Sequence, residues 1–199
     1  MDLINSQSHI FETKDFQSVV DKAIHFFETT AIHQLPLSDS FYGAGVYALY
    51  YYGDFEHYQS LFNTVNGKVP IYVGKAVPPG WRTARNKISK STDLYRRLSE
   101  HAKSINLAEN LDIGDFKCRF MILGDNEADL VVPVEAQLIR RFTPLWNSVI
   151  DGFGNHDPGS GRYNQAQSSW DILHPGRPWA KKLTGKAQSL EEIIEKIKV

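Results

Sequence analysis

The sequence is poor in sulfur and has no long apolar stretch. A single cysteine, Cys118, excludes an internal disulfide and any zinc site built from several cysteines. No apolar run approaches the ~20 residues that a membrane-spanning helix needs. The first residues show neither the basic segment nor the apolar segment of a signal peptide. We therefore expect a cytoplasmic protein in which Cys118 is a small packed thiol.

The chain as a whole also lacks an excess of charge of either sign, but its acidic and basic residues are unevenly distributed along the sequence. The net charge is −1, whereas residues 2–57 hold eight acids and two bases. Residues 75–103 hold eight bases against Asp93 and Glu100. Such a basic block predicts a face that binds a polyanion, although a solvated basic loop would carry the same charge.

Length and hydrophobic periodicity predict one domain, with a helix near its start. The chain has 199 residues, of which 42% are hydrophobic, as expected of an ordinary globular protein. Residues 14–34 form an amphipathic helical pattern that ends before Pro36. Its apolar stripe consists of Phe16, Val19, Val20, Ala23, Ile24 and Phe27. Such a stripe is typical of a helix that covers a sheet.

Three segments have the composition of β-strands, namely residues 45–52, 69–75 and 116–123. They are rich in valine, isoleucine and aromatic residues, and the first two are bounded by glycine and proline. Residues 76–90 show neither helical nor strand periodicity and contain Pro78-Pro79-Gly80 followed by alternating basic residues. A loop of this length inside a compact domain is usually functional.

A helix is predicted from Asp93 onward, capped by Ser91 or Thr92. Its apolar stripe is formed by Leu94, Leu98, Ala102 and Ile105. Arg97 and His101 lie four residues apart and project on the same side as this stripe. An arginine directed toward a sheet needs an anionic partner, because burial of an unpaired guanidinium is costly.

A further helix is predicted to start near Pro133, with Glu135 in the middle of an apolar face formed by Leu138, Ile139 and Phe142. Two structural explanations compete with a functional one. A glutamate in the first turn complements the helix dipole, and a buried glutamate can simply pair with Arg97.

The C-terminal part is irregular before it ends in a short helix. Residues 151–182 are rich in glycine and proline and contain Trp170, Arg177 and Trp179. Tryptophan and arginine among glycines suit a loop held against a flat ligand or a partner, and equally an irregular cap on the core. Apolar residues at positions 190, 193, 194 and 197 predict the terminal amphipathic helix.

Five separate pieces of sequence, read in order, resemble the GIY-YIG family of DNA-cutting domains. They are Gly45-Val46-Tyr47, Ile71-Tyr72-Val73-Gly74, Arg97 to His101, Glu135, and Pro144-Leu145-Trp146-Asn147. Both signature triplets are slightly altered, to GVY and YVG, and the connection between them is longer than in most members. The resemblance covers residues 45–150.

The resemblance implies an α+β fold, with a small central antiparallel sheet of about three strands flanked by helices. On this hypothesis the chain is a single nuclease domain with a core at residues 45–150. The elaborations are an N-terminal helical extension (1–44), an insertion (76–90) and a loop-rich C-terminal extension (151–199).

The resemblance also assigns roles to residues of this chain. Tyr47 matches the general base or its activator, Tyr72 the second tyrosine, Arg97 the phosphate-binding arginine, and His101 the histidine four residues later. Glu135 matches the metal ligand and Asn147 the asparagine that braces the site. One protein carboxylate suits Mg²⁺, for which Mn²⁺ can substitute, since Mg²⁺ keeps several water and phosphate ligands. A phenol with a pKa near 10 is a weak base at neutral pH, so either Tyr47 is activated or His101 takes the proton.

The basic insertion after the second triplet and the glycine-rich stretch that ends in His174-Pro175-Gly176-Arg177 resemble type II restriction enzymes of this family, among them those that cut CCGCGG. This resemblance implies a bacterial cytoplasmic endonuclease that cuts double-stranded DNA as a homodimer, alongside a cognate DNA methyltransferase. The candidate DNA-binding residues are Lys75, Arg82, Arg85, Lys87, Lys90, Arg162, Asn164, Gln165 and Arg177, since arginine, lysine, asparagine and glutamine read base edges and contact phosphates. A repair or homing-type nuclease and a nonenzymatic nucleic-acid-binding module are the alternatives.

Overall fold

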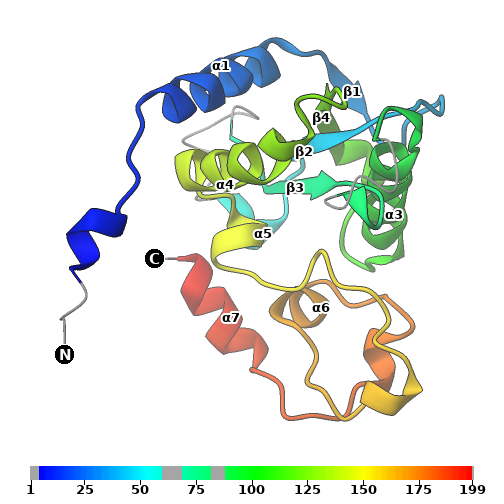
Figure 1. Cartoon of the computed structure of the whole chain (residues 1–199). Helices are drawn as coiled ribbons and strands as arrows, with labels where there is room; N and C mark the ends of the chain where they lie inside the picture. Colours follow the sequence, from blue (N-terminus) through cyan, green and yellow to red (C-terminus); the bar gives the residue numbers. More distant parts are fainter. Residues whose placement is uncertain (1–4, 60–68, 82–87, 199) are drawn as a thin grey trace.

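The chain folds around one open antiparallel sheet in the computed structural model, which describes residues 5–59, 69–81 and 88–198. The strands lie in the order β1-β4-β2-β3 (Figure 1). They are β1 (Ile32–Gln34), β2 (Ala44–Tyr51), β3 (Tyr72–Ala76) and β4 (Phe116–Leu123). The predicted α+β class is therefore confirmed, with four strands where about three were expected.

Helices flank this sheet and continue into the C-terminal segment. They are α1 (Asp15–Thr29), α3 (Asp93–Leu107), α4 (Val131–Phe142), α5 (Leu145–Ser148), α6 (Ser169–Leu173) and α7 (Leu190–Ile197). Short 3-10 turns lie at Ser6–His9, Glu56–Tyr58, Ile88–Lys90, Ile113–Asp115, Ala128–Leu130, Ser160–Arg162 and Ala180–Lys182. Among the described residues, no helix has both the length and the apolarity that a membrane crossing requires.

Strand β2 is the centre of the protein, because all eight of its residues are buried. Successive side chains of a strand point to opposite faces of the sheet. Tyr47 and Leu49 accordingly pack in one apolar cluster, which also contains residues of α3, α6 and α7. Val46 and Ala48 pack in the other, which contains residues of α1 and α4. The sheet therefore separates two helical layers.

The prediction of one helix over residues 14–34 is wrong at its C-terminal end. Helix α1 ends at Thr29, and residues 32–34 form the edge strand β1 against β4. The hydroxyls of Thr29 and Thr30 donate to the carbonyls of Phe26 and Phe27, at 2.7 and 2.8 Å. These bonds satisfy main-chain acceptors that a longer helix would have used. The apolar stripe had itself ended at Phe27.

Helix α3 begins where the sequence predicted. The Oγ of Ser91 accepts a hydrogen bond from the Asp93 amide at 3.0 Å, so Ser91 rather than Thr92 provides the cap. Leu94, Leu98 and Ile105 are fully buried against the sheet. This packing fixes the rotation of α3 and thereby directs the residues between them, Arg97 and His101, toward β2.

A chain of hydrogen bonds crosses the apolar cluster on the α3 side of the sheet. The indole of Trp146 can only donate, and it donates to the Tyr58 hydroxyl at 2.8 Å. Tyr58 then donates to Nε2 of His174, and Nδ1–H of His174 donates to Oδ1 of Asn110 at 2.9 Å. His174 is therefore held neutral, and its burial lowers its pKa to about 3.

Replacement of His174 with glutamine tests this burial through pH. A buried neutral histidine binds protons less readily than the same residue in the unfolded chain, so the stability that it contributes is complete above pH ~6.5 and is lost on acidification. We expect the free-energy advantage of wild type over His174→Gln to shrink by about 2 kcal/mol between pH 7 and pH 5. Urea unfolding at both pH values measures it. An advantage that stays constant with pH would contradict a buried neutral imidazole.

Candidate functional site

Tyr47 lies at the centre of the candidate site, on the face of β2 that packs against α3. Its side chain is completely buried, and its partner in the neighbouring strand is Gly74. A Cβ atom placed on Gly74 would lie 2.5 Å from the Tyr47 hydroxyl. The last residue of the YVG triplet must therefore be glycine, because the phenol of the GVY triplet passes directly over it.

The Tyr47 hydroxyl is hydrogen-bonded to Nε2 of His101 at 2.6 Å. Beneath it the His101 ring is stacked on Phe153, with the ring centroids 4.5 Å apart and an interplanar angle of 17°. The Tyr72 ring lies 5.2 Å from the imidazole and 6.2 Å from the Tyr47 ring. The two signature tyrosines and the histidine thus meet in one cluster.

Burial sets the protonation of this pair. It raises the pKa of Tyr47 well above its usual value, the nearby Tyr72 raises it further, and Arg97 opposes both. Burial also lowers the pKa of His101 well below its usual value, and the positive charge of Arg97 adds to that effect. At neutral pH the pair is therefore a phenol hydrogen-bonded to an uncharged imidazole.

Arg97 extends from α3 beside Tyr47, and only 20% of its side chain is exposed. Its guanidinium donates to Glu100 at 3.2 Å, to the Gly154 carbonyl at 2.8 Å, and to Nε2 of His156. The inward direction predicted for Arg97 is thus observed. Its anionic partner is Glu100, one helical turn away on α3.

Glu135 approaches from α4 and forms an ion pair with Lys75 of β3. The sequence had offered two structural explanations for Glu135, and neither describes its position. Arg97 is not its partner, and α4 begins at Val131, which places Glu135 beyond the first turn and its exposed amides. Glu135 is 16% exposed and Lys75 35%.

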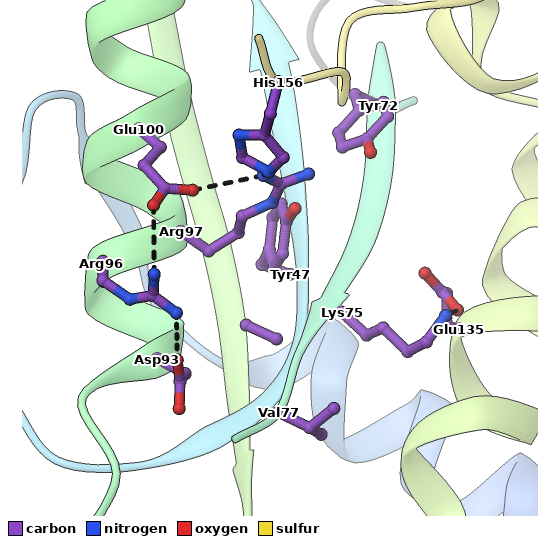
Figure 2. A pocket seen from close by; sticks show the side chains of 11 residues that line it. Tyr47, Tyr72, Lys75, Val77, Asp93, Arg96, Arg97, Glu100, Glu135 and His156 are labelled. Carbon is purple, nitrogen blue, oxygen red and sulfur yellow. Dashed lines mark hydrogen bonds and ion pairs between the residues drawn. The ribbon is translucent and has the colours of Figure 1, made fainter. Parts of the chain in front are cut away.

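One cavity of about 610 Å³ joins these groups (Figure 2). It is lined by Tyr47, Tyr72, Lys75, Ala76, Val77, Asp93, Arg96, Arg97, Glu100, Glu135 and His156. Tyr47 lies on the α3 side of the sheet, whereas Lys75 and Glu135 come from the α4 side. Because β3 is an edge strand, groups from both sides of the sheet reach the same cavity at that edge.

Asn147 does not line this cavity but fixes the strand that borders it. Its Oδ1 accepts from the Val73 amide at 2.7 Å, and its Nδ2 donates to the Val73 carbonyl at 2.9 Å. The side chain thus replaces a neighbouring strand along this part of β3. Val73 lies between Tyr72 and Gly74, so Asn147 braces the second signature triplet.

Sequence reasoning did not assign Asp93, Arg96 and Glu100 to the cavity. It also missed two residues at or beside the cavity that lie outside the helices, His156 and Phe153. Both lie in the glycine-rich segment after α5, where no periodicity relates one residue to another. The sole signal was the density of glycine and aromatic residues in residues 151–182.

The predicted DNA contacts fall in different places. Lys75 lines the cavity, while Lys90, Arg162, Asn164 and Gln165 are exposed on loops. Arg82, Arg85 and Lys87 lie outside the described residues. For these exposed loop residues, DNA contact stays a prediction.

The prediction that Arg177 contacts DNA is wrong, because its side chain is only 1% exposed and cannot reach DNA. Its Nε donates to Asp171 at 2.6 Å, and its other nitrogens donate to main-chain carbonyls. It also lies between the rings of Trp170 and Trp179, 4.5 and 4.7 Å from their centroids. Of the two interpretations of this segment, the cap on the core is the one observed.

The edge cavity thus combines a fixed cation and a carboxylate, and phosphodiester hydrolysis uses such groups to stabilise negative charge and to hold a metal ion. Residues 39–199 match the family described as the Eco29kI GIY-YIG domain. Since the match covers most of the chain, the protein belongs to this family of restriction-type nucleases that act on DNA. The comparison with curated proteins gives no match.

Proposed function

We propose that this protein is a type II restriction endonuclease that hydrolyses both strands of double-stranded DNA at a GC-rich palindrome resembling CCGCGG. The observation that carries the proposal is the hydrogen bond between buried His101 and Tyr47, which lines a cavity together with Arg97 and Glu135. A structural tyrosine–histidine pair would not need to adjoin a cavity with an arginine and a carboxylate. A bacterial cytoplasm and a cognate methyltransferase follow from the same proposal.

In the proposed reaction, Tyr47 and His101 relay a proton. Water attacks phosphorus as its proton passes to the Tyr47 oxygen, while the Tyr47 proton passes to Nε2 of His101. A P–O bond to the water oxygen forms, and the bond to the leaving oxygen breaks. The leaving oxygen keeps the electron pair and takes a proton from a second water molecule, which gives a free hydroxyl end. The low pKa of His101 opposes this transfer in the free protein, but a phosphodiester in the cavity adds negative charge that favours the imidazolium.

Arg97 is well placed to bind the phosphate that is cut. Its guanidinium borders the cavity beside Tyr47 and already binds one carboxylate and one carbonyl. A planar fork of donors matches phosphate oxygens, and fixed positive charge stabilises the negative charge that grows on them during attack. Tyr72, on the neighbouring strand, would support the same group.

The cavity also fits one divalent cation bound through Glu135. The carboxylate is partly buried and already binds a cationic group, the Lys75 ammonium. No cluster of three or more acidic, histidine or cysteine side chains suited to a metal occurs in the described part of the chain. A single protein carboxylate suits Mg²⁺, or Mn²⁺ in its place, because Mg²⁺ commonly takes one or two carboxylates and completes its shell with water and phosphate oxygens. Such an ion would neutralise charge on the phosphate and lower the pKa of a water molecule.

Supercoiled plasmid incubated with the protein, with and without Mg²⁺, tests the proposed function. We expect discrete linear fragments with Mg²⁺, and end sequencing should place every cut in one palindrome. Random nicks would indicate a repair-type nuclease, and retardation without cutting would indicate a binding module. Either result would remove the restriction activity.

Sequence reading is proposed for the remaining basic and amide candidates from the sequence. The candidates are Arg82, Arg85, Lys87, Lys90, Arg162, Asn164 and Gln165, and Lys75 is now proposed to act inside the cavity. Such side chains bind guanine and adenine edges in the major groove, or phosphates.

We predict that the complex on a short cognate duplex contains two protein chains. One cavity of this kind acts on one strand, and a palindromic target mirrors a two-fold dimer. Analytical ultracentrifugation of the complex measures the stoichiometry, with a scrambled duplex as control. A one-to-one complex that cuts both strands in a single binding event would contradict the dimer.

A further inference from the structure

The segment that completes the cavity comes from the C-terminal extension. We call residues 152–156 the site loop. It contacts His101 and Arg97, because Phe153 stacks on the His101 ring and the Gly154 carbonyl accepts a hydrogen bond from Arg97. His156 adds a second acceptor for the same guanidinium. A Cβ on Gly154 would lie 2.8 Å from the Tyr72 hydroxyl and 3.3 Å from Arg97, so the loop backbone touches the site directly.

Arg177 holds this loop from the side away from the cavity. Its Nη1 donates to the carbonyls of Phe153 and Asn155 at 3.1 and 3.2 Å, and its Nη2 donates to that of Gly152 at 3.0 Å. Asp171, itself only 1% exposed, accepts from Nε and neutralises the charge. One planar guanidinium therefore fixes three of the five carbonyls of the site loop.

A contribution to folding stability does not by itself explain why a buried Arg177–Asp171 pair holds the site loop. A buried ion pair contributes little compared with well-packed apolar residues of the same volume, because both charges lose their hydration. An apolar side chain would fill the space between Trp170 and Trp179, but it could not bind three carbonyls. A lysine would keep the charge, but its compact ammonium lacks the planar fork.

We propose that Arg177 is a positioning residue of the nuclease site, acting through the site loop on Arg97 and His101. The inference rests on the proposed function only in one respect, namely that the reaction carried out at the positioned site is DNA cleavage. When the loop is fixed, Gly154 and His156 hold the Arg97 guanidinium beside Tyr47. Phe153 shields the His101 ring from water and fixes its orientation. With the loop loosened, Arg97 loses two acceptors and water reaches His101.

Arg177→Lys is the main test, because it preserves the positive charge near His101 and removes only the fork. We expect single-turnover cleavage to fall by about 10²-fold, the effect of a misplaced site, with DNA affinity nearly unchanged. We also expect the pH midpoint of the His101 imidazole, followed by NMR in the free protein, to rise toward its ordinary value as water enters. The His101 signal is assigned with His101→Gln.

Two companion variants test the path through the loop. Phe153→Leu should raise the His101 midpoint without any change at Arg177, and His156→Ala should slow cleavage by loosening Arg97. Arg140→Lys, on an exposed arginine of α4, and Ile24→Ala, in the cluster on the other side of the sheet, are the controls. We expect both to keep the His101 midpoint and the cleavage rate at a temperature where they are folded.

The outcomes separate the possibilities. Arg177→Lys with lower thermal stability but an unchanged His101 midpoint and rate would make Arg177 a purely structural residue. Loss of DNA affinity or selectivity alone, with an unchanged His101 midpoint and rate, would overturn the positioning of the site by Arg177. If wild type does not cut DNA, the proposed function fails, and the His101 midpoint still decides the positioning. If Arg177→Lys does not fold, Asp171→Asn, which weakens the same anchor, must give the same changes on a smaller scale, and unchanged values would overturn the inference.

Discussion

Tyr47→Phe is expected to give a folded, DNA-binding protein whose single-turnover cleavage rate is about 10²–10⁴-fold below wild type. The substitution removes one oxygen, the atom 2.6 Å from Nε2 of His101, and keeps the ring that packs over Gly74. The lost hydrogen bond leaves buried His101 without this partner and costs about 1–3 kcal/mol of stability, so the rate is measured at a temperature where the variant is fully folded. Quenched-flow cleavage of a labelled duplex with enzyme in excess measures the chemical step.

The chain supplies a closely matched control in Tyr58→Phe. Tyr58 is equally buried and also hydrogen-bonded to a histidine, His174, but it lies away from the cavity. We expect this variant to lose stability and to keep its cleavage rate, while Tyr72→Phe should lose less rate than Tyr47→Phe. If Tyr47→Phe stays within about threefold of wild type, the phenol is structural and His101 becomes the leading candidate for the base.

Glu135→Ala is expected to abolish cleavage while the protein still folds and binds DNA. The carboxylate is the proposed protein ligand of the metal, and its removal takes away charge neutralisation at the phosphate but leaves the basic loops in place. The released partner, Lys75, is one-third exposed and remains hydrated, so the cost in stability is small. Cleavage across a Mg²⁺ titration and fluorescence anisotropy with labelled duplex separate the two effects.

Glu109→Ala provides the comparison, because it breaks another glutamate–lysine pair, with Lys181, far from the cavity. We expect wild-type cleavage from it. Two results would count against Glu135 as the metal ligand. One is unfolding of Glu135→Ala with retained activity in Glu135→Gln, and the other is wild-type cleavage by Glu135→Ala at every Mg²⁺ concentration.

Segments with a regular spacing of apolar residues were predictable, because that spacing determines which side chains of a helix or strand are buried. The stripe of α3 placed Arg97 and His101 toward the sheet, and the composition of β2 and β4 identified both strands within one residue. Strand β1 escaped prediction since all three of its residues are exposed and carry no apolar alternation. Main-chain pairing with β4 defines it, supported by hydrogen bonds from the Gln34 side chain and by stacking of His33 on Phe120.

The ion-pair partner of a charged side chain was less predictable than the direction in which the side chain points. The sequence indicated that Arg97 and Glu135 both point inward, and a pair between them was one interpretation because each buried charge needs a partner. The structure places them on opposite sides of β3, where each finds a closer partner. Arg177 shows the same limit, because no local pattern distinguishes an arginine that reads DNA from one that binds the backbone of a loop.

Cleavage in H₂¹⁸O tests water attack, and with it the proposed hydrolysis, most directly. After a single turnover with Mg²⁺, mass spectrometry of the new DNA ends should find one ¹⁸O atom in the terminal phosphate and no DNA attached to the protein. Tyr47 would then act on the proton of water. An unlabelled phosphate, together with DNA covalently joined to Tyr47, would show that the phenol attacks phosphorus itself and would contradict the proposed proton relay.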